Sequence, residues 1–480
     1  MRRNKYCATV LGVSLAVILA ANSPVWAAPT PVSKPSPFAS CTIGGSPGSV
    51  VFVNGEVEPW LTVNPKNASN LIGAWQQDRW SDGGAHGLVA GFSFDGGHTW
   101  GQTPLPFSAC ASGLGYERAS DPWVSIGPDG TAYAVSISFN QSNNNNAVAA
   151  AVSNDGGQTW GNLSVIIANN EPTVQFFNDK ESVTANPTKA GVAYAVWDRL
   201  ELPNGNPYAN LHTAAFRGPT LFSKTVDGGK TWSSPSEIVT VPSRQQTIGN
   251  QIVVDPRDGT LYDFFDLITP PFSKAAGRVA FIKSTDDGAT WTKPQVIATL
   301  QTVSVFDPNT GTPVRTGDII PEPAIDPATG QLYVVWQDSR FKGGHFDEVA
   351  LSTSADGGQT WSSPIRVNTF TGRPAFNPSV RVNPVGTVAV TYYDFRNLKA
   401  TDTTLPTDYW RTTSPRGGAN FGNELHIAGS FDMKTAPFAE GYFIGDYQGL
   451  DATATEFVPF FVQTTGDASN PTDVFVAPSP

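Results

Sequence analysis

An eight-residue phrase that returns along the 480-residue chain constrains its fold more than any other feature. Five copies follow the pattern Ser/Thr-x-Asp-Gly/Asp-Gly-x-Thr-Trp, and a sixth, at 414–421, has Arg416 and Phe421 in place of the Asp and the Trp. Consecutive copies end 59 to 72 residues apart. The recurrence predicts an array of one structural unit. The full copies occupy 93–100, 153–160, 225–232, 284–291 and 354–361.

Each copy predicts a tight turn between two antiparallel strands. An apolar run such as 87–92 or 147–152 leads into it, and the Gly-Gly or Asp-Gly pair adopts backbone angles that other residues resist. The Asp carboxylate can accept hydrogen bonds from the turn, and the Trp ring can be buried where the return strand begins. A purely structural role is therefore predicted for Asp95, Trp100, Asp155, Trp160, Asp227, Trp232, Asp286, Trp291, Asp356 and Trp361.

A second pattern precedes each hairpin. It consists of an acidic or polar residue, an alternating strand, a turn of the Asn-Pro type and an aromatic-rich strand, and a seventh copy begins at Asp446. The whole predicts an all-β fold, a single β-propeller of four-stranded blades. A mean spacing of about 64 residues favours seven blades, with six as the alternative. Strand 49–53 is expected to close the ring as the outer strand of the last blade.

The N-terminus predicts export. Basic Arg2, Arg3 and Lys5 precede a short apolar run, and small residues allow cleavage after Ala27, so 1–27 is predicted to be a signal peptide. An uncleaved anchor is the alternative. Residues 28–48 are expected to be an unstructured leader, and 49–480 the propeller. The protein is expected outside the cell or in the periplasm.

Cysteine content predicts a cross-link within the chain, and net charge limits the classes of molecule that the protein can bind. After cleavage two cysteines remain, Cys41 and Cys110, which predict a disulfide in an exported protein, with two free thiols as the alternative. The mature chain has a net charge of about −14, which disfavours nucleic acid and anionic membranes. No metal or other cofactor is predicted, and a monomer is expected.

The repeated phrase resembles the Asp-box, or bacterial neuraminidase repeat, and the chain resembles the sialidase superfamily of β-propellers. Members of that family have six blades. The resemblance implies a secreted glycoside hydrolase of the exo-alpha-sialidase type, acting on the terminal sugars of glycans. A non-catalytic propeller that binds glycans or protein partners through one face is the alternative, because other propellers also carry the Asp-box.

The resemblance also implies roles for particular residues. Sialidases grip the sugar carboxylate with three arginines, use an Asp as acid/base, and have a Tyr nucleophile activated by a Glu. The stretch 78–84 resembles the loop that carries the acid/base, here Asp82. Glu322 resembles the activating Glu and Tyr447 the nucleophile. The implied substrate-binding arginines are Arg79, Arg340 and Arg396, with Arg381 as an alternative for the third.

The expected position of the site follows from connectivity. The Asn-Pro turns and the Asp-boxes share one face of a propeller, and the polar strand starts share the other with Asp- and Arg-rich strand ends such as 336–340. That second face is expected to bind the ligand. The alternative for these residues is Asp–Arg pairing between neighbouring blades. A cation held by Glu58, Asp121, Glu181 and Glu322 is a further possibility.

The chain departs from the family at the first inner strand. Sialidases have an aromatic-Arg-Ile-Pro motif there, whereas 56–59 reads Glu-Val-Glu-Pro. Two carboxylates in place of the arginine would repel a sialic acid by on the order of 1 kcal/mol each. The sequence therefore predicts either that Arg79 takes the place of the missing arginine or that the ligand is not a sialic acid.

Overall fold

The computed structural model describes residues 28–171, 175–201, 217–270, 277–422 and 424–479. This part of the chain is all-β, with two short 3₁₀ turns, η2 (Arg340–Lys342) and η3 (Met433–Thr435). None of its helices is long and apolar enough to cross a membrane. The predicted signal peptide, 1–27, lies outside the described residues.

Most strands pair in chain order into four-stranded antiparallel units, as the sequence predicted. The strands of the first four units are β3 (Val57–Val63), β4 (Leu71–Trp80), β5 (Ala85–Ser93) and β6 (Gly101–Leu105); β7 (Arg118–Ile126), β8 (Ala132–Phe139), β9 (Asn146–Ser153) and β10 (Gly161–Asn169); β11 (Phe176–Ala185), β12 (Ala193–Glu201), β13 (Thr220–Thr225) and β14 (Ser236–Val239); β15 (Gln246–Val254), β16 (Leu261–Ile268), β17 (Arg278–Ser284) and β18 (Gln295–Thr299).

The remaining units follow the same plan. Their strands are β21 (Glu322–Ile325), β22 (Leu332–Asp338), β23 (Glu348–Ser354) and β24 (Ile365–Arg366); β25 (Ala375–Val382), β26 (Val388–Asp394), β27 (Pro406–Ser414) and β28 (Leu425–Asp432); and β30 (Gly449–Ala452), β31 (Phe457–Asp467) and β32 (Asn470–Val476) with β1 (Thr30–Pro31). A single pair, Ala85 with Ala119, joins the first two units into one larger sheet.

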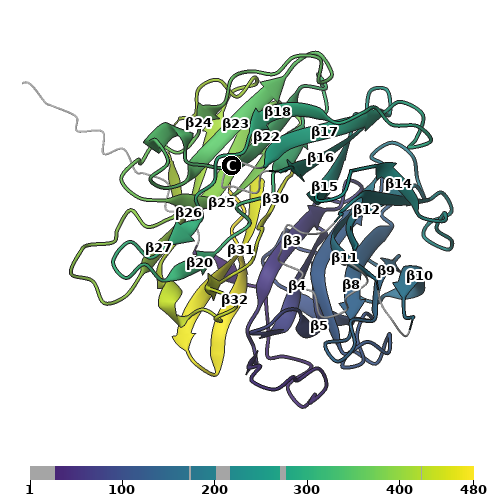
Figure 1. Cartoon of the computed structure of the whole chain (residues 1–480), viewed down its shortest axis with the longest axis horizontal. Coiled ribbons are helices and arrows are strands. Elements are labelled where there is room, and N and C mark those ends of the chain that lie inside the picture. Colours follow the sequence, from purple (N-terminus) through teal and green to yellow (C-terminus); the bar gives the residue numbers. More distant parts are fainter. Residues whose placement is uncertain (1–27, 172–174, 202–216, 271–276, 423, 480) are drawn as a thin grey trace, which may run out of the picture.

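The units lie side by side around a centre (Figure 1). Their first strands contact one another in chain order, and β30 of the last unit contacts β3 of the first. The second strands supply the largest buried side chains, among them Trp75, Trp197 and Trp336. Large rings fill the wedge between neighbouring sheets, which explains why the second strand of each unit is rich in aromatic residues.

The Asp-boxes have the structural role predicted for them. In the first box the Asp95 carboxylate accepts hydrogen bonds from Ser93 Oγ (2.8 Å), the Thr99 amide (2.9 Å) and Thr99 Oγ1 (2.6 Å). The same three contacts recur in the other four full copies. In the sixth copy, Arg416 instead forms an ion pair with Asp326 of the preceding unit at 2.8 Å.

The N-terminal arm corrects two predictions. The outer strand of the last unit is β1, which pairs with β32, whereas β2 (Val51–Phe52), from the expected closing strand 49–53, pairs with β4 of the first unit. The segment 28–48, expected to lack structure, contains β1 and the buried side chains of Val32 and Phe38. An outermost strand leaves one edge open, so even a proline-containing segment can pair with it.

A small extra sheet was not predicted. It contains β19 (Val305–Phe306), β20 (Pro313–Arg315) and β29 (Tyr442–Phe443), and β20 pairs with β29 in parallel. Its first two strands come from the segment between β18 and β21. The segment lies so close to the loop before β30 that a Cβ atom on Gly317 would be 1.8 Å from the Asp446 carbonyl oxygen. This contact brings the insertion onto the centre of the molecule.

The predicted disulfide is present and generates a stability prediction. Cys41 and Cys110 are bonded across 69 residues of sequence, which ties the arm to the first unit. Replacing both with Ser removes a long cross-link from the unfolded chain, so the free energy of unfolding should fall by about 2–4 kcal/mol. Urea unfolding without reductant measures it. Reductant should destabilise the wild type similarly and leave the double variant unchanged. Equal unfolding midpoints for the two proteins would contradict the prediction.

Candidate functional site

A cavity of about 500 Å³ opens where the first strands of the units begin. Charged side chains from several units line it together with the small extra sheet, and we call it the main cavity. Its charged lining is Arg79, Asp82, Asp121, Asp179, Lys180, Arg315, Asp318, Glu440 and Asp446. A second space of about 570 Å³, the opposite cavity, is lined by the proline turns. The polar strand starts at Asp121, Lys180 and Asp446 therefore line a different cavity from the proline turns, as expected, whereas the strand start at Glu322 lines the cavity of the turns.

β-Bulges direct side chains of the first strands. Five of these strands shift register near their start, and the residue in the shift has a positive φ angle. A bulge inserts an extra residue and re-aims its side chain, and a positive φ is costly for any residue with a Cβ atom, so the surrounding structure imposes it. These residues are Glu58 (55°), Asp121 (55°), Lys180 (50°), Gly249 (73°) and Asn377 (47°).

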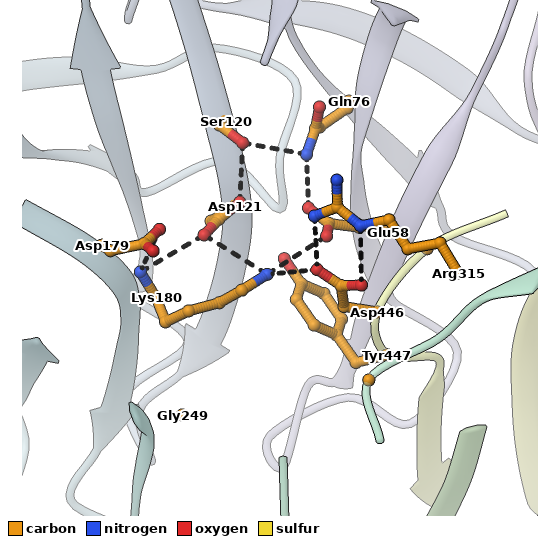
Figure 2. A network of polar contacts seen from close by, with 12 residues as sticks. Glu58, Gln76, Ser120, Asp121, Asp179, Lys180, Gly249, Arg315, Asp446 and Tyr447 are labelled. Atoms are coloured by element: carbon orange, nitrogen blue, oxygen red, sulfur yellow. Dashed lines mark hydrogen bonds and ion pairs between the residues drawn. The ribbon is translucent and has the colours of Figure 1, made fainter. Parts of the chain in front are cut away.

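Lys180 lies in the middle of a cluster of carboxyl groups (Figure 2). Its Nζ lies 2.8 Å from Asp446 Oδ2, 3.3 Å from Glu58 Oε1 and 3.6 Å from Asp121 Oδ2. Burial opposes the charge on the lysine, but the carboxylates, Asp121 first, outweigh it and raise the pKa of Lys180 well above its usual value. The ammonium group is therefore a permanent cation and is unsuited to act as a base or nucleophile.

The carboxyl groups around Lys180 have pKa values shifted in opposite directions. Burial and the neighbouring Asp121 charge raise the pKa of Asp179 to about 7, and burial raises that of Glu58 to about 8. Burial also opposes ionisation of Asp446, but Arg315 and Lys180 lower its pKa below the usual range. Near neutral pH the cluster therefore contains both ionised carboxylates and carboxyl groups able to donate a proton.

The backbone N–H of Lys180 holds the carboxyl groups of Asp179 and Asp121 next to each other. The Lys180 amide lies 3.1 Å from Asp179 Oδ1 and 3.3 Å from Asp121 Oδ2, and both contacts are visible in Figure 2. Ser120 Oγ donates to Asp121 at 2.6 Å. Burial opposes ionisation of Asp121, but Lys180 and Ser120 lower its pKa. Asp121 and Asp179 are thus neighbouring carboxyl groups with opposite protonation preferences, and both line the main cavity.

Arg79 is a buried cation on the same cavity. Its Nη1 donates to Gln76 Oε1 at 2.8 Å, while its Nε has no hydrogen-bond partner. Among the described residues, no carboxylate lies within ion-pair distance of it. Burial and the charge of Arg315 lower its pKa to about 10. Both guanidinium groups lie over the Phe443 ring, at 4.8 Å for Arg79 and 4.4 Å for Arg315. Arg79 can therefore receive an anionic group.

The structure does not gather the three predicted catalytic residues in one cavity, which corrects their expected convergence. Asp82 lines the main cavity but pairs with Arg118 at 2.9 Å. Tyr447 lies beneath the cavity, with its ring 5.2 Å from that of Trp123, and burial raises its pKa well above the usual value. Glu322 lines the opposite cavity. In the loop before β30, Asp446 faces the main cavity, whereas the adjacent Tyr447 packs below it and donates to the Pro122 carbonyl oxygen at 3.3 Å.

Two of the three predicted substrate-binding arginines lie elsewhere. Arg340 pairs with Asp338 at 2.7 Å, and Arg396 pairs with Asp394 and Glu424, each at 2.7 Å. Neither lines the main cavity. The Asp–Arg pairs named as the alternative are therefore present, although these two lie within one unit. Arg381 joins neighbouring units through Asp451 at 2.8 Å and lines the opposite cavity. Arg79 alone has the predicted location.

The residues that do converge were partly visible in the sequence. Asp121, Lys180 and Asp446 each occupy a recurring polar strand start. No sequence pattern pointed to Arg315, because it lies in the insertion between β18 and β21. The cation hypothesis for Glu58, Asp121, Glu181 and Glu322 gains no support, since the described part of the chain contains no cluster of three or more His, Cys, Asp or Glu arranged to hold a metal ion. Lys180 Nζ occupies the space between the carboxylates instead.

Comparisons with known proteins show the fold alone. No family model matches the chain, and no curated protein matches it. A solved structure of a PL25 polysaccharide lyase, an ulvan lyase bound to a GlcA–Rha3S saccharide, is similar with a TM-score of 0.51 and 13% identity, over 89% of this chain and 96% of that one. At this identity the similarity is one of fold.

Two further solved structures are similar at lower scores. A Penicillium chrysogenum alpha-L-arabinanase complexed with arabinobiose has a TM-score of 0.49 and 13% identity, over 94% of this chain and 98% of that one. A Hadza microbial sialidase has a TM-score of 0.48 and 16% identity, over 86% and 74% of the two chains.

Replacing Lys180 with Met should strongly destabilise the protein. The variant leaves Asp121 buried without its cation and Asp446 with Arg315 alone, and the loss of one partner of a buried ion pair typically costs about 3–5 kcal/mol. The matched control is Lys189→Met, because Lys189 pairs with Asp287 at 2.6 Å but is 45% exposed, so its loss should cost less than about 1 kcal/mol. Urea unfolding at pH 7 compares the two variants. Equal losses would show that the central ion pairs do not stabilise the fold.

Replacing Glu322 with Gln should change how stability depends on pH. Burial raises the pKa of Glu322 to about 8, above its unfolded value of about 4.3. Its stabilising contribution is then complete below about pH 4.3 and is lost as pH rises towards 8. The variant should lose less thermal stability than the wild type between pH 5 and pH 8. Glu456→Gln, at an exposed position, should match the wild type. Parallel pH profiles for Glu322→Gln and the wild type would contradict the prediction.

Proposed function

We propose that this protein is a secreted, glycan-active enzyme that works in the main cavity. The observation that carries the proposal is the convergence, on one cavity of about 500 Å³, of carboxyl groups from separate units with opposite pKa shifts. Neighbouring carboxyl groups of that kind perform acid and base catalysis on glycosidic bonds. Export by cleavage after Ala27 and function as a monomer, without nucleic acid or membrane partners, belong to the same proposal.

We infer that the scaffold of this site is a ring of seven blades. Seven four-stranded units support the number, and the contact of β30 with β3 supports closure. In such a ring the first strands surround the axis, and their starts meet at one face. The site then depends on several blades, because Glu58, Asp121, Lys180 and Asp446 come from four different units or their leading loops.

In the proposed reaction, Asp179 is the general acid and Asp121 its ionised partner. With a pKa of about 7, Asp179 retains a proton near neutral pH that it can donate to the departing glycosidic oxygen. The Asp121 carboxylate stabilises the positive charge that develops on the sugar, and a water molecule then adds to the anomeric carbon and returns a proton to Asp179. Lys180 holds both carboxyl groups through its amide and balances the negative charge with its ammonium group.

The cations of the cavity support a substrate that carries a carboxylate. Arg79 has an unpartnered Nε and no acidic partner among the described residues, and a guanidinium group can bind a carboxylate through two parallel hydrogen bonds. Activity of the exo-alpha-sialidase type on terminal sugars is the specific form of this proposal. Asp179 takes the role that the resemblance implied for Asp82, Asp121 stabilises the sugar cation where the resemblance implied a tyrosine nucleophile, and Arg79 with Arg315 replaces the three arginines.

A non-catalytic, glycan-binding propeller is the second candidate. The observation that favours it is that the Asp446 carboxylate is already neutralised by Lys180 at 2.8 Å and Arg315 at 3.0 Å. A cluster with satisfied charges can recognise a glycan without reacting with it. In this form the same main cavity binds the sugar, and Arg79 still receives its carboxylate.

Activity assays on residues 28–480 test the proposal. Sialosides, arabinan, ulvan and aryl glycosides serve as substrates, with released sugars, new reducing ends and unsaturated uronates as readouts. Asp179→Asn should lower kcat about 100-fold or more, and wild-type activity should fall above about pH 7 as Asp179 loses its proton. Asp258→Asn, at an exposed turn, is the matched control and should keep full activity.

The outcomes separate the candidates. Tyr447→Phe should retain activity under the present assignment, whereas a tyrosine nucleophile requires its loss. Glycan binding without turnover on any substrate favours the second candidate. Turnover that survives Asp179→Asn contradicts the proposed general acid.

A further inference from the structure

The hairpin of β19 and β20 presents two different faces. Val305 pairs with Val314, and Phe306 pairs with Pro313. Val305 and Val314 are 1% and 3% exposed and belong to the hydrophobic core. Because side chains alternate along a strand and paired residues share a face, Phe306 and Pro313 lie on the other face, together with Arg315 two residues on. Arg315 on that face reaches the central cluster, where it binds Asp446.

Phe306 departs from the pattern of its hairpin. A solvent-facing position normally carries a polar residue, yet the Phe306 side chain is 44% exposed. Among the large apolar residues that are exposed in the described part of the chain, only Phe306 lines the main cavity. Leaving an aromatic ring in water forfeits the free energy that its burial would provide. Such a local departure is typical of a functional position.

The main cavity combines apolar walls with a charged floor. Phe139 and Phe177 contribute to a wall and contact each other edge to face, with ring centroids 5.6 Å apart. The floor carries Asp121, Asp179 and Lys180. A pyranose ring has the same division, because its C–H faces are apolar and its hydroxyl groups are polar. Aromatic rings bury such apolar faces while hydroxyl groups reach charged side chains.

We propose that Phe306 is a stacking platform for a second sugar ring, next to the sugar held at the charged floor. The protein then binds oligosaccharides of two or more units in preference to single sugars. This inference rests on the proposed function for the reaction at the floor, but binding at Phe306 needs no reaction. Arg315 and Phe306 share one face of one hairpin, so the insertion provides both the ionic contact at the floor and the stacking surface.

Affinity electrophoresis of the full mature chain tests the inference. Native gels contain polysialic acid, arabinan or ulvan, and retardation gives a dissociation constant for each polymer. Phe306→Ala should raise the dissociation constant about tenfold for the polymer that retards the wild type, and Phe306→Trp should restore binding. Phe438→Ala is the matched control, because Phe438 is 46% exposed but does not line the cavity. Thermal unfolding checks that each variant is folded.

Two results would overturn the platform. One is unchanged retardation of Phe306→Ala, and the other is a wild type that none of the three polymers retards. Failure of the stacking platform can be distinguished from failure of the proposed enzymatic function. Asp179→Asn should lower kcat about 100-fold or more and keep the retardation. Retardation that depends on Phe306 without any turnover keeps the platform and rejects the enzyme. Turnover of aryl glycosides without retardation by any polymer does the opposite.

Discussion

The buried ammonium group of Lys180 is the interaction on which the centre of the molecule depends. Its three carboxylate partners come from the first unit, the second unit and the loop before the last. The ionised Asp121 and Asp446 would be costly to bury without a cation, and Lys180 would be costly to bury without them. Their mutual neutralisation permits the strand starts of distant parts of the chain to meet.

The same charges shift the pKa values of neighbouring carboxyl groups in opposite directions. Asp446 pairs with two cations, whereas Asp179 accepts a hydrogen bond from the Lys180 amide and lies near the Asp121 charge. Neighbouring carboxyl groups therefore differ in protonation. Arg79 remains without an acidic partner in the described residues and faces the same cavity. An arrangement that stabilises the fold thus also prepares an acid, a carboxylate and an anion receptor.

Scaffold and site come from different kinds of sequence. The Asp-box hairpins repeat the same local hydrogen bonds and line neither the main cavity nor the opposite one. The site instead uses positions where the units differ from one another, such as Glu58, Asp121 and Lys180, and the insertion between β18 and β21. A repeat array can therefore keep its architecture while its central cavity changes its chemistry.

Adjacent residues show why the predicted site was only partly right. The prediction selected Tyr447 where Asp446 faces the cavity, and it singled out Glu181 at a strand start where Lys180 supplies the central cation. A one-residue shift moves a side chain to the other face of a strand, and the bulges that set this shift leave no clear mark in the local sequence. The arginines at 340 and 396 were plausible by position, but each has a carboxylate partner two residues away.

The sequence by itself determined the four-stranded units, the structural role of the Asp-boxes and the pairing of Cys41 with Cys110. These features depend on local turn chemistry, on periodicity and on having only two cysteines after the expected cleavage. Only the tertiary structure decided that β1 completes the last unit, that Arg315 reaches Asp446, and that Lys180 lies among carboxylates. Those contacts join segments up to several hundred residues apart, and their partners are chosen by packing around a common centre, which no local pattern encodes.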